Sequence, residues 1–162
     1  MQNIVTKHTL LFQYKMVQDA RTVLFTYCAS ISEPDFIRSS EYVGNGGSIR
    51  NLLVHICNSY SRWMGYFALK QDIDKLPYES IKDLNGCKAY FARVDALMIT
   101  FLDHFQNNYE IPITAIIAGA ERTASPLAIF THVITHEFHH KGQIATIGRT
   151  WGYIPIDTDV LR

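Results

Sequence analysis

Histidines are concentrated in one stretch of the chain, between Thr131 and Gln143. Four of the seven histidines lie in it, at His132, His136, His139 and His140. An α-helix turns by about 100° per residue, so side chains four residues apart lie on nearly the same face. Two histidines with this spacing can bind one metal ion with little ordering cost. His136 and His140 are therefore candidate metal ligands.

The predicted helix that carries these histidines has recognisable ends. Ser125-Pro126 is typical of an N-cap followed by proline at the first helical position. Gly152 and Pro155 are typical of the region after a helix. The pattern predicts a helix from about Pro126 to Thr150, which at about 1.5 Å per residue is long enough to span a small domain.

His55 is the candidate for a third metal ligand. It lies beside the apolar stripe of a second predicted helix, where a single histidine is more often a core residue than a ligand. If a facing helix presents His136 and His140, a ligand role for His55 becomes the preferred interpretation, because metal sites in bundles are built from inward side chains of facing helices. Three histidines with an open position are typical of catalytic sites for zinc, with nickel as an alternative.

The other histidines are weaker candidates. His132 lies one turn before His136 but drifts away from the axis of the ligand pair, which favours a supporting or exposed position. His139 must point in another direction, and we expect it at the surface or at an interface. His8 and His104 have no partner in the sequence, so neither is predicted to belong to the site.

Residues His136 to His140 also satisfy the HExxH pattern, in which the glutamate is a general base that activates water. Glu137 is therefore a candidate catalytic residue. The longer metzincin pattern is not met, because Gln143 and Thr146 stand where it requires glycine and histidine. Glu137 is also turned by about 100° from His136, so its reach to the metal depends on the tertiary structure.

Composition limits the class of protein. The 15 basic and 15 acidic residues give zero net charge, which argues against nucleic acid or an anionic membrane as a partner. Three cysteines without a CxxC pair favour a reducing compartment. No stretch resembles a signal peptide or a transmembrane helix. We expect one cytoplasmic domain over residues 1–162 with a sizeable core.

Four helices are predicted to position the candidate ligands, at about 6–31, 48–69, 80–106 and 126–150. Glu33-Pro34 is expected to end the first helix, and Ser80 with Asp83 resembles a capping box for the third. A loop is expected through residues 42–47, an extended segment or short hairpin within 109–124, and an irregular but packed tail after Tyr153. The pattern predicts an all-α single four-helix bundle with long connections and a short irregular C-terminal tail.

Three motifs make the chain resemble the DinB/YfiT-like family of metal-binding four-helix bundles. The first is Ser48-Ile49-Arg50 followed by His55 and Trp63. The second is HEFHHKGQI at residues 136–144, where Lys141 replaces a common arginine, and the third is GYIPIDTD at 152–159. The resemblance runs from about residue 10 to the end, although the first helix lacks a tryptophan-asparagine pair often found there.

The resemblance implies a bundle with non-sequential helix order and metal ligands at His55, His136 and His140. Characterised relatives include transferases that use low-molecular-weight thiols and a related thiol-dependent isomerase. We therefore predict a metal-dependent thiol transferase acting on a small electrophilic substrate, since a metal with an open position can lower the pKa of a thiol. The alternatives are a metal-dependent hydrolase of a small molecule and a bundle that binds a metal or ligand without catalysis.

A homodimer is also predicted. Tyr60, Tyr66 and Phe67 make the second helix more apolar than one small bundle needs, and dimers are frequent in the family that the chain resembles. The alternative is that these three side chains are ordinary core and rim aromatics.

Overall fold

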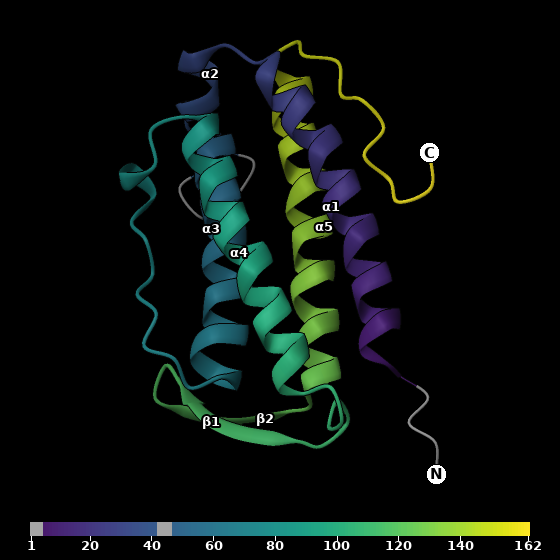
Figure 1. Ribbon diagram of the computed structural model, residues 1–162. Coiled ribbons are helices and arrows are strands. Elements are labelled where there is room, and N and C mark those ends of the chain that lie inside the picture. The colour runs from purple at the N-terminus through teal and green to yellow at the C-terminus, as the bar shows by residue number, and fades with distance from the viewer. Residues whose placement is uncertain (1–4, 42–46) are drawn as a thin grey trace.

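The computed structural model describes residues 5–41 and 47–162 (Figure 1). Its long helices are α1 (Lys7–Ala29), α3 (Ile49–Tyr60), α4 (Leu84–His104) and α5 (Pro126–Thr150). A short helix, α2 (Glu33–Ile37), lies at one end of them, and a hairpin of β1 (Ile113–Ile117) and β2 (Ala120–Ala124) lies across the other. The predicted, mostly helical class is confirmed, whereas the predicted loop at 42–47 falls almost wholly outside the described residues.

Packing between the helices does not follow their order in the sequence. Helix α3 packs against both α4 and α5, and α1 packs against the same two helices. Helix α5, with its histidines, therefore faces α3, which carries His55 (Figure 1). Buried side chains fill the space between the helices, among them Leu24, Ile56, Phe101 and Ile144. Within the described residues, no helix combines the length and apolar character needed to cross a membrane.

Side chains at the helix starts accept hydrogen bonds from N–H groups that the first turn leaves unpaired. The hydroxyl of Ser48 accepts from the N–H of Asn51 at 3.0 Å and precedes α3. The hydroxyl of Ser125 accepts from the N–H of Ala128 at 3.2 Å, with proline in the first turn of α5. The predicted starts of these two helices are therefore confirmed.

The third predicted helix starts later than expected. Asp83 is itself the N-cap of α4, and its carboxylate accepts from the N–H of Gly86 at 2.8 Å. Ser80 belongs to a separate 3-10 turn, Tyr78–Ser80, where its hydroxyl donates to the carbonyl of Pro77 at 2.7 Å. The predicted capping box is wrong, because the aspartate caps its own helix and the serine is used by the preceding turn.

The first predicted helix ends earlier than expected, because α1 stops at Ala29. Glu33 and Pro34 then begin α2 instead of only ending the first helix. The Ser32 hydroxyl caps α2 by accepting from the N–H of Asp35. Proline is suited to the first turn, where its missing N–H would have had no helical partner.

The second predicted helix changes its hydrogen-bonding pattern midway. Residues Ser61–Ala68 form a π-helix, η1, directly after α3. The wider turn of a π-helix is seen in the hydrogen bond that the N–H of Leu69 donates to the carbonyl of Met64, five residues earlier, at 3.0 Å. A Cβ atom at Gly65 would lie 2.3 Å from Cδ1 of Ile73, so glycine permits this close packing. The prediction of one uninterrupted α-helix is therefore wrong here.

Residues 109–124, which were expected to form either an extended segment or a short hairpin, contain a hairpin. Strands β1 and β2 pair antiparallel, with Ile113 opposite Ala124 and Ile117 opposite Ala120. The two turn residues, Ala118 and Gly119, have φ angles of 51° and 78°. Positive φ at both positions is typical of the tight turns that match the twist of a two-stranded hairpin. The hairpin alternative is confirmed.

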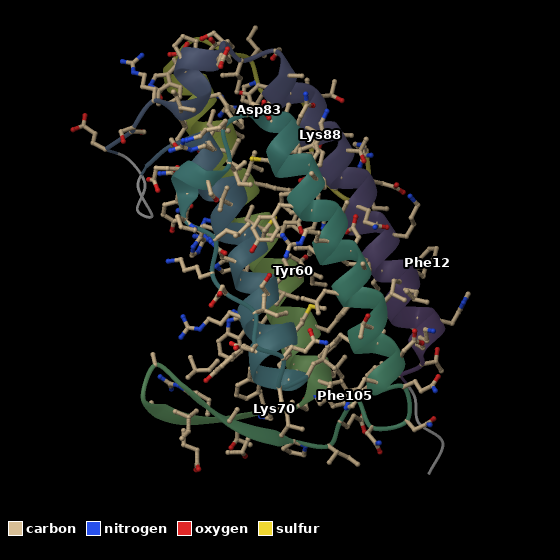
Figure 2. All side chains as sticks on the ribbon, turned by 60° about the vertical axis from the view of Figure 1, so that its left-hand side comes forward. Phe12, Tyr60, Lys70, Asp83, Lys88 and Phe105 are labelled. Atoms are coloured by element: carbon tan, nitrogen blue, oxygen red, sulfur yellow. The ribbon has the colours of Figure 1, made fainter. Side chains whose placement is uncertain are left out.

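Two of the three aromatic residues that suggested a homodimer belong to the core. Tyr60 and Phe67 are fully buried, whereas Tyr66 is 47% exposed. Figure 2 shows Tyr60 between the helices and Phe12 at the outer edge of the molecule. The alternative of core and rim aromatics therefore describes these residues correctly, and the homodimer stays a prediction.

The C-terminal tail is irregular, as predicted, but it is less packed than expected, because no residue after Tyr153 is buried and Ile154 and Leu161 are 88% and 86% exposed. The hydroxyl of Tyr153 donates to the carboxylate of Asp35 at 2.7 Å. Further along, the carbonyl of Thr158 accepts a hydrogen bond from the ammonium group of Lys141 at 3.0 Å. The ammonium of this buried lysine also lies 3.4 Å from the centre of the Phe138 ring. Contacts to α2 and α5 thus hold the tail in place.

Candidate metal centre

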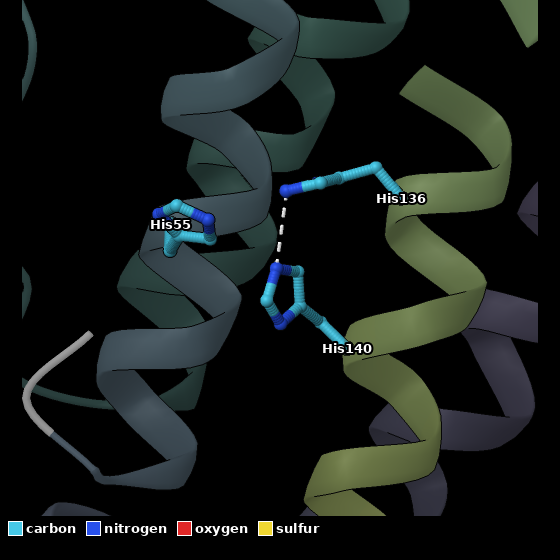
Figure 3. Close-up of side chains that lie close together, drawn as sticks. All are labelled: His55, His136 and His140. Carbon is cyan, nitrogen blue, oxygen red and sulfur yellow. Dashed lines mark hydrogen bonds between the residues drawn. The ribbon is translucent and has the colours of Figure 1, made fainter. Parts of the chain in front are cut away.

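Three histidines from two facing helices converge on one point (Figure 3). His55 lies on α3, while His136 and His140 lie one turn apart on α5. Each offers a ring nitrogen, and the three nitrogens lie within 4.8 Å of one another. Their ring centroids are 4.4 to 5.1 Å apart. The structure thus brings together the three histidines that were predicted as metal ligands.

The nitrogen spacing fits one metal ion. Nε2 of His136 and Nε2 of His140 lie 3.1 Å apart. Two nitrogens that bind zinc at about 2.0–2.1 Å are roughly 3.3 Å apart in tetrahedral geometry. The nitrogen of His55 lies no more than 4.8 Å from the other two, so a shift of at most about 1.5 Å completes the triangle.

Gln143 determines how one of these rings is protonated. Its side-chain oxygen Oε1 lies 2.6 Å from Nδ1 of His140. Because this oxygen can only accept, Nδ1 carries the proton and Nε2 keeps its lone pair. That lone pair is directed toward His136, as a metal ligand requires. A partner that fixes the tautomer in this way is typical of metal-binding histidines.

His136 has a hydrogen-bond partner for only one of its two ring nitrogens. Its Nδ1 is buried and has no hydrogen-bond partner among the described residues. An unsatisfied buried polar atom destabilises a protein by about 1–3 kcal/mol, so core histidines are normally paired. Nε2 meets only another histidine, at His140. Nε2 is therefore the nitrogen of His136 that faces the other histidines and is positioned to bind a metal, whereas Nδ1 lacks the partner that Gln143 provides for His140.

Burial lowers the pKa of all three histidines. The pKa of His55 falls to about 4, through burial first and then through the charges of His140 and Lys75. The pKa of His136 falls to about 3, again through burial first and then through the neighbouring histidines. For His140, burial lowers the pKa and the hydrogen bond to Gln143 partly opposes it. The rings are therefore neutral near pH 7, the form that binds metal ions.

Comparison with known families identifies the family of the chain. The family model described as the DinB family matches residues 1–162, the whole chain. The chain belongs to the DinB family. The resemblance predicted from three sequence motifs is thereby confirmed, and no curated protein matches the chain.

Two further histidines of this DinB-family protein lie near the group of three but outside it. The ring of His132 packs against Trp63, with centroids 5.0 Å apart, and lies 5.7 Å from the ring of His136. His139 is exposed, with its ring 4.9 Å from that of His140. Both positions agree with the supporting and surface placements predicted for them.

Glu137 does not face the histidine group and is fully buried. Its two carboxylate oxygens accept hydrogen bonds from Nε and Nη2 of Arg21 at 2.8 and 2.9 Å. Oε2 also accepts from the hydroxyl of Tyr60 at 2.7 Å. A carboxylate with three such bonds is not positioned as a base beside the histidines. The HExxH interpretation is corrected here, because the rotation of about 100° per residue directs Glu137 into the core.

Glu137 belongs to a polar cluster that sequence reasoning missed, formed by Tyr14, Arg21, Tyr60, Asp95 and Glu137. We call it the buried polar cluster, because all its members except Asp95, whose side chain is 32% exposed, are buried. Nη1 of Arg21 donates to Asp95 at 2.7 Å, and the hydroxyl of Tyr14 donates to the same carboxylate oxygen at 2.6 Å. The cluster links α1, α3, α4 and α5. One signal was available in the sequence, since Arg21 continues the apolar stripe of α1 two turns after Tyr14.

A cavity of about 500 Å³ lies beside His55 and His136. Its lining mixes apolar, hydroxyl, amide and cationic groups, from Asn58, Ser59, Ser61, Arg62, Trp63, Tyr66, Ile73, Lys75 and His132. Several of these belong to η1, and π-helical turns are frequent at functional sites. The volume is in the range of sites for small-molecule ligands. In this DinB-family protein the candidate metal centre therefore has direct access to a binding cavity.

Proposed function

We propose that this protein is a metal-dependent transferase that attaches a low-molecular-weight thiol to a small electrophilic substrate. His55, His136 and His140 would hold one divalent ion, zinc or nickel, which when bound lowers the pKa of a thiol. The four long helices would form a single bundle that keeps α3 and α5 at the distance this site needs. The partner is a small molecule in the cytoplasm, and neither nucleic acid nor a membrane is required.

The position of Glu137 is the observation that carries this proposal. A hydrolase of the HExxH type needs this glutamate as a base beside the reacting water. The contacts of Glu137 with Arg21 and Tyr60 instead use both of its oxygens in the core. Thiol transfer does not need a base at that position, because the cosubstrate supplies the nucleophile. The cavity of about 500 Å³ offers space for the cosubstrate next to the histidines.

The chain's own residues would bind and orient the reactants. Oε1 of Gln143 accepts a hydrogen bond from Nδ1–H of His140 and holds that ring in place. Trp63 and Tyr66 provide aromatic walls, and the contact of Trp63 with His132 fixes one of them. In the transfer, the sulfur forms a bond to the electrophilic carbon, the leaving group departs with its electron pair, and the thiol proton passes to solvent.

A metal-dependent hydrolase is the second candidate, and His132 is the observation in its favour. This histidine lines the cavity, and burial lowers its pKa, so it is neutral and can accept a proton from water near pH 7. The third candidate, a bundle that binds metal or ligand without catalysis, would use the same histidines without turnover.

Turnover assays with and without thiol distinguish the three candidates. Protein loaded with zinc or nickel would be assayed on a chloronitroarene with several thiols, and on ester and amide substrates without thiol. We expect metal-dependent turnover that requires added thiol and saturates with it, and that is lost in His136→Ala. Metal-dependent hydrolysis that is indifferent to thiol would overturn the proposal in favour of the hydrolase. Metal binding without turnover in either assay would leave a binding protein.

We also propose that the protein forms a homodimer. Large apolar side chains remain exposed on the described surface, among them Phe12, Ile99, Ile111 and Ile116. Burial of such side chains against a second copy would remove apolar area from water. Sedimentation velocity at micromolar concentration should give the mass of two chains, and a monomer would contradict the proposal.

A further inference from the structure

The cavity beside the histidines has an excess of positive charge. Its eleven lining residues include two cations, Arg62 and Lys75, and no carboxylate. The whole chain has 15 basic and 15 acidic residues, so the excess is local. Neither cation forms an ion pair with any residue that the structure describes. The ammonium of Lys75 lies 5.4 Å from the centre of the Tyr78 ring, a contact that leaves its N–H donors available, as those of Arg62 are, to a ligand in the cavity.

The fold holds both cations at the cavity wall. Arg62 belongs to η1, which continues directly from the helix that carries His55. Lys75 lies in a segment without regular secondary structure, and its neighbour Leu76 is fixed by Asn58. The Asn58 side chain donates to the carbonyl of Leu76 and accepts from its N–H, both at 2.9 Å. Asn58 is only 6% exposed, so this double hydrogen bond anchors the segment from inside the protein.

We infer that this cavity recognises a carboxylate-bearing small molecule, whose carboxylate is bound by Arg62 and Lys75. Guanidinium and ammonium groups donate charge-assisted hydrogen bonds to carboxylates, which are stronger than those between neutral groups. Trp63 and Tyr66 would contact the apolar part of the same ligand, which leaves its reactive group toward His55 and His136. The reactive end of this ligand rests on the proposed function, whereas recognition of the carboxylate does not.

The carboxylate can belong to the thiol or to the electrophile, and two binding experiments distinguish them. Protein loaded with Co²⁺, a spectroscopic substitute for zinc, would be titrated with mercaptopropionate and with its neutral analogue mercaptopropanol. A second pair, a chloronitrobenzoate and the matching benzamide, tests the electrophile. We expect the anionic member of one pair to bind about tenfold more tightly, and salt to reduce this preference. An equal affinity within both pairs would overturn the inference.

Three double variants test the residues. Arg62→Ala with Lys75→Ala should reduce the preference to within about twofold while metal stoichiometry is retained, and charge reversal to glutamate at both positions should favour cationic cysteamine over mercaptopropionate. The control, Lys82→Ala with Arg122→Ala, removes two exposed cations outside the cavity and should keep the wild-type preference. A preference that survives in the Arg62 and Lys75 variant would assign recognition to other residues and overturn the inference.

Failure of the proposed function would be visible separately, as absent metal stoichiometry or absent turnover. Carboxylate recognition would then be measured on the metal-free protein with benzoate and benzamide. Trp63 fluorescence in a Trp151→Phe background reports on the cavity, because the chain has only these two tryptophans. Tighter binding of benzoate would support the inference without the enzyme, and equal binding would overturn it.

Discussion

His136 and Glu137 are adjacent on α5 but belong to two regions with different properties. His136 lies at the edge of a cavity, with an unsatisfied buried nitrogen and a second histidine 3.1 Å away. Glu137 lies in the buried polar cluster, where Arg21 and Tyr60 satisfy its carboxylate. One residue of helical rotation, about 100°, separates the two environments.

The comparison shows how the same helix can serve stability on one face and ligand binding on another. In the buried polar cluster, residues from four helices satisfy one another, and such a network makes a packed core specific. In the histidine group, nitrogens of three neutral rings lie within 4.8 Å of one another, and Nδ1 of His136 has no hydrogen-bond partner among the described residues. A group that is incomplete without a ligand is available to bind one. Substitutions in the two regions should therefore affect different measurements.

The largest effect is expected for Glu137→Gln, on stability. Removal of this charge leaves buried Arg21 with only half-buried Asp95 as an ionic partner, which should lower the free energy of unfolding by about 3 kcal/mol. Urea denaturation would measure it, with exposed Glu121→Gln on β2 as a control expected to change by less than about 0.5 kcal/mol. Unchanged stability with lost turnover would instead make Glu137 a catalytic base.

A second variant, Arg21→Met with Glu137→Leu, removes both charges of the Arg21–Glu137 ion pair. It sharpens the comparison between the buried polar cluster and the histidine group. Replacement of a buried ion pair by apolar side chains is often neutral or stabilising, so part of the stability lost in Glu137→Gln should return. The hydroxyl of Tyr60 and the carboxylate of Asp95 also lose a partner in this variant, which limits the recovery. Metal stoichiometry should equal that of the wild type, since neither residue belongs to the histidine group.

A smaller change is expected for His55→Ala, on metal-dependent stability. A ligand that binds only the native state at 100 times its Kd stabilises it by about 2.7 kcal/mol. In His55→Ala, zinc should stabilise the protein much less, because the two remaining histidines bind the ion more weakly than three. Unfolding with and without Zn²⁺ would measure it, with exposed His104→Ala at the end of α4 as the control. Unchanged metal binding would exclude His55 as the third ligand.

Gln143→Leu should affect metal affinity alone. Loss of the hydrogen bond that orients His140 is expected to weaken metal binding by about 10–100-fold at unchanged stoichiometry. Competition with a chelator of known affinity would measure the change. Gln143→Glu keeps an acceptor for Nδ1 and should retain most of the affinity. Wild-type affinity in Gln143→Leu would show that the 2.6 Å contact does not orient the ring.

The last prediction uses a different measurement, the pH dependence of the metal-free protein. The pKa values of His55 and His136 are about 4 and about 3 in the folded state, against about 6.5 when unfolded. Below pH 6.5 the unfolded chain binds protons that the folded protein excludes, so the free energy of unfolding falls as the pH decreases toward the folded values. The difference between the urea midpoints at about pH 7 and about pH 5 should be smaller in the variant His55→Ala with His136→Ala than in the wild type. An equal difference would contradict the burial of these rings.

Local features of the sequence were sufficient to predict the central helix and its ligand pair. Ser125 and Pro126 act within the first turn of α5, and the spacing of His136 and His140 places both rings on one face of any helix. His55 could be added because a facing helix is a general property of helix bundles. These inferences depend on contacts within a few residues, or on one rule of packing.

The tertiary structure alone decided what surrounds each of these side chains. The sequence shows that Glu137 points away from His136, but Arg21, which lies 116 residues earlier, determines that it is buried in an ion pair. Gly65 of the π-helix packs closely against Ile73, and the hydrogen bonds between Asn58 and Leu76 anchor the segment that carries Lys75. Helix periodicity specifies the direction of a side chain, whereas its environment depends on residues distant in sequence that only folding brings together.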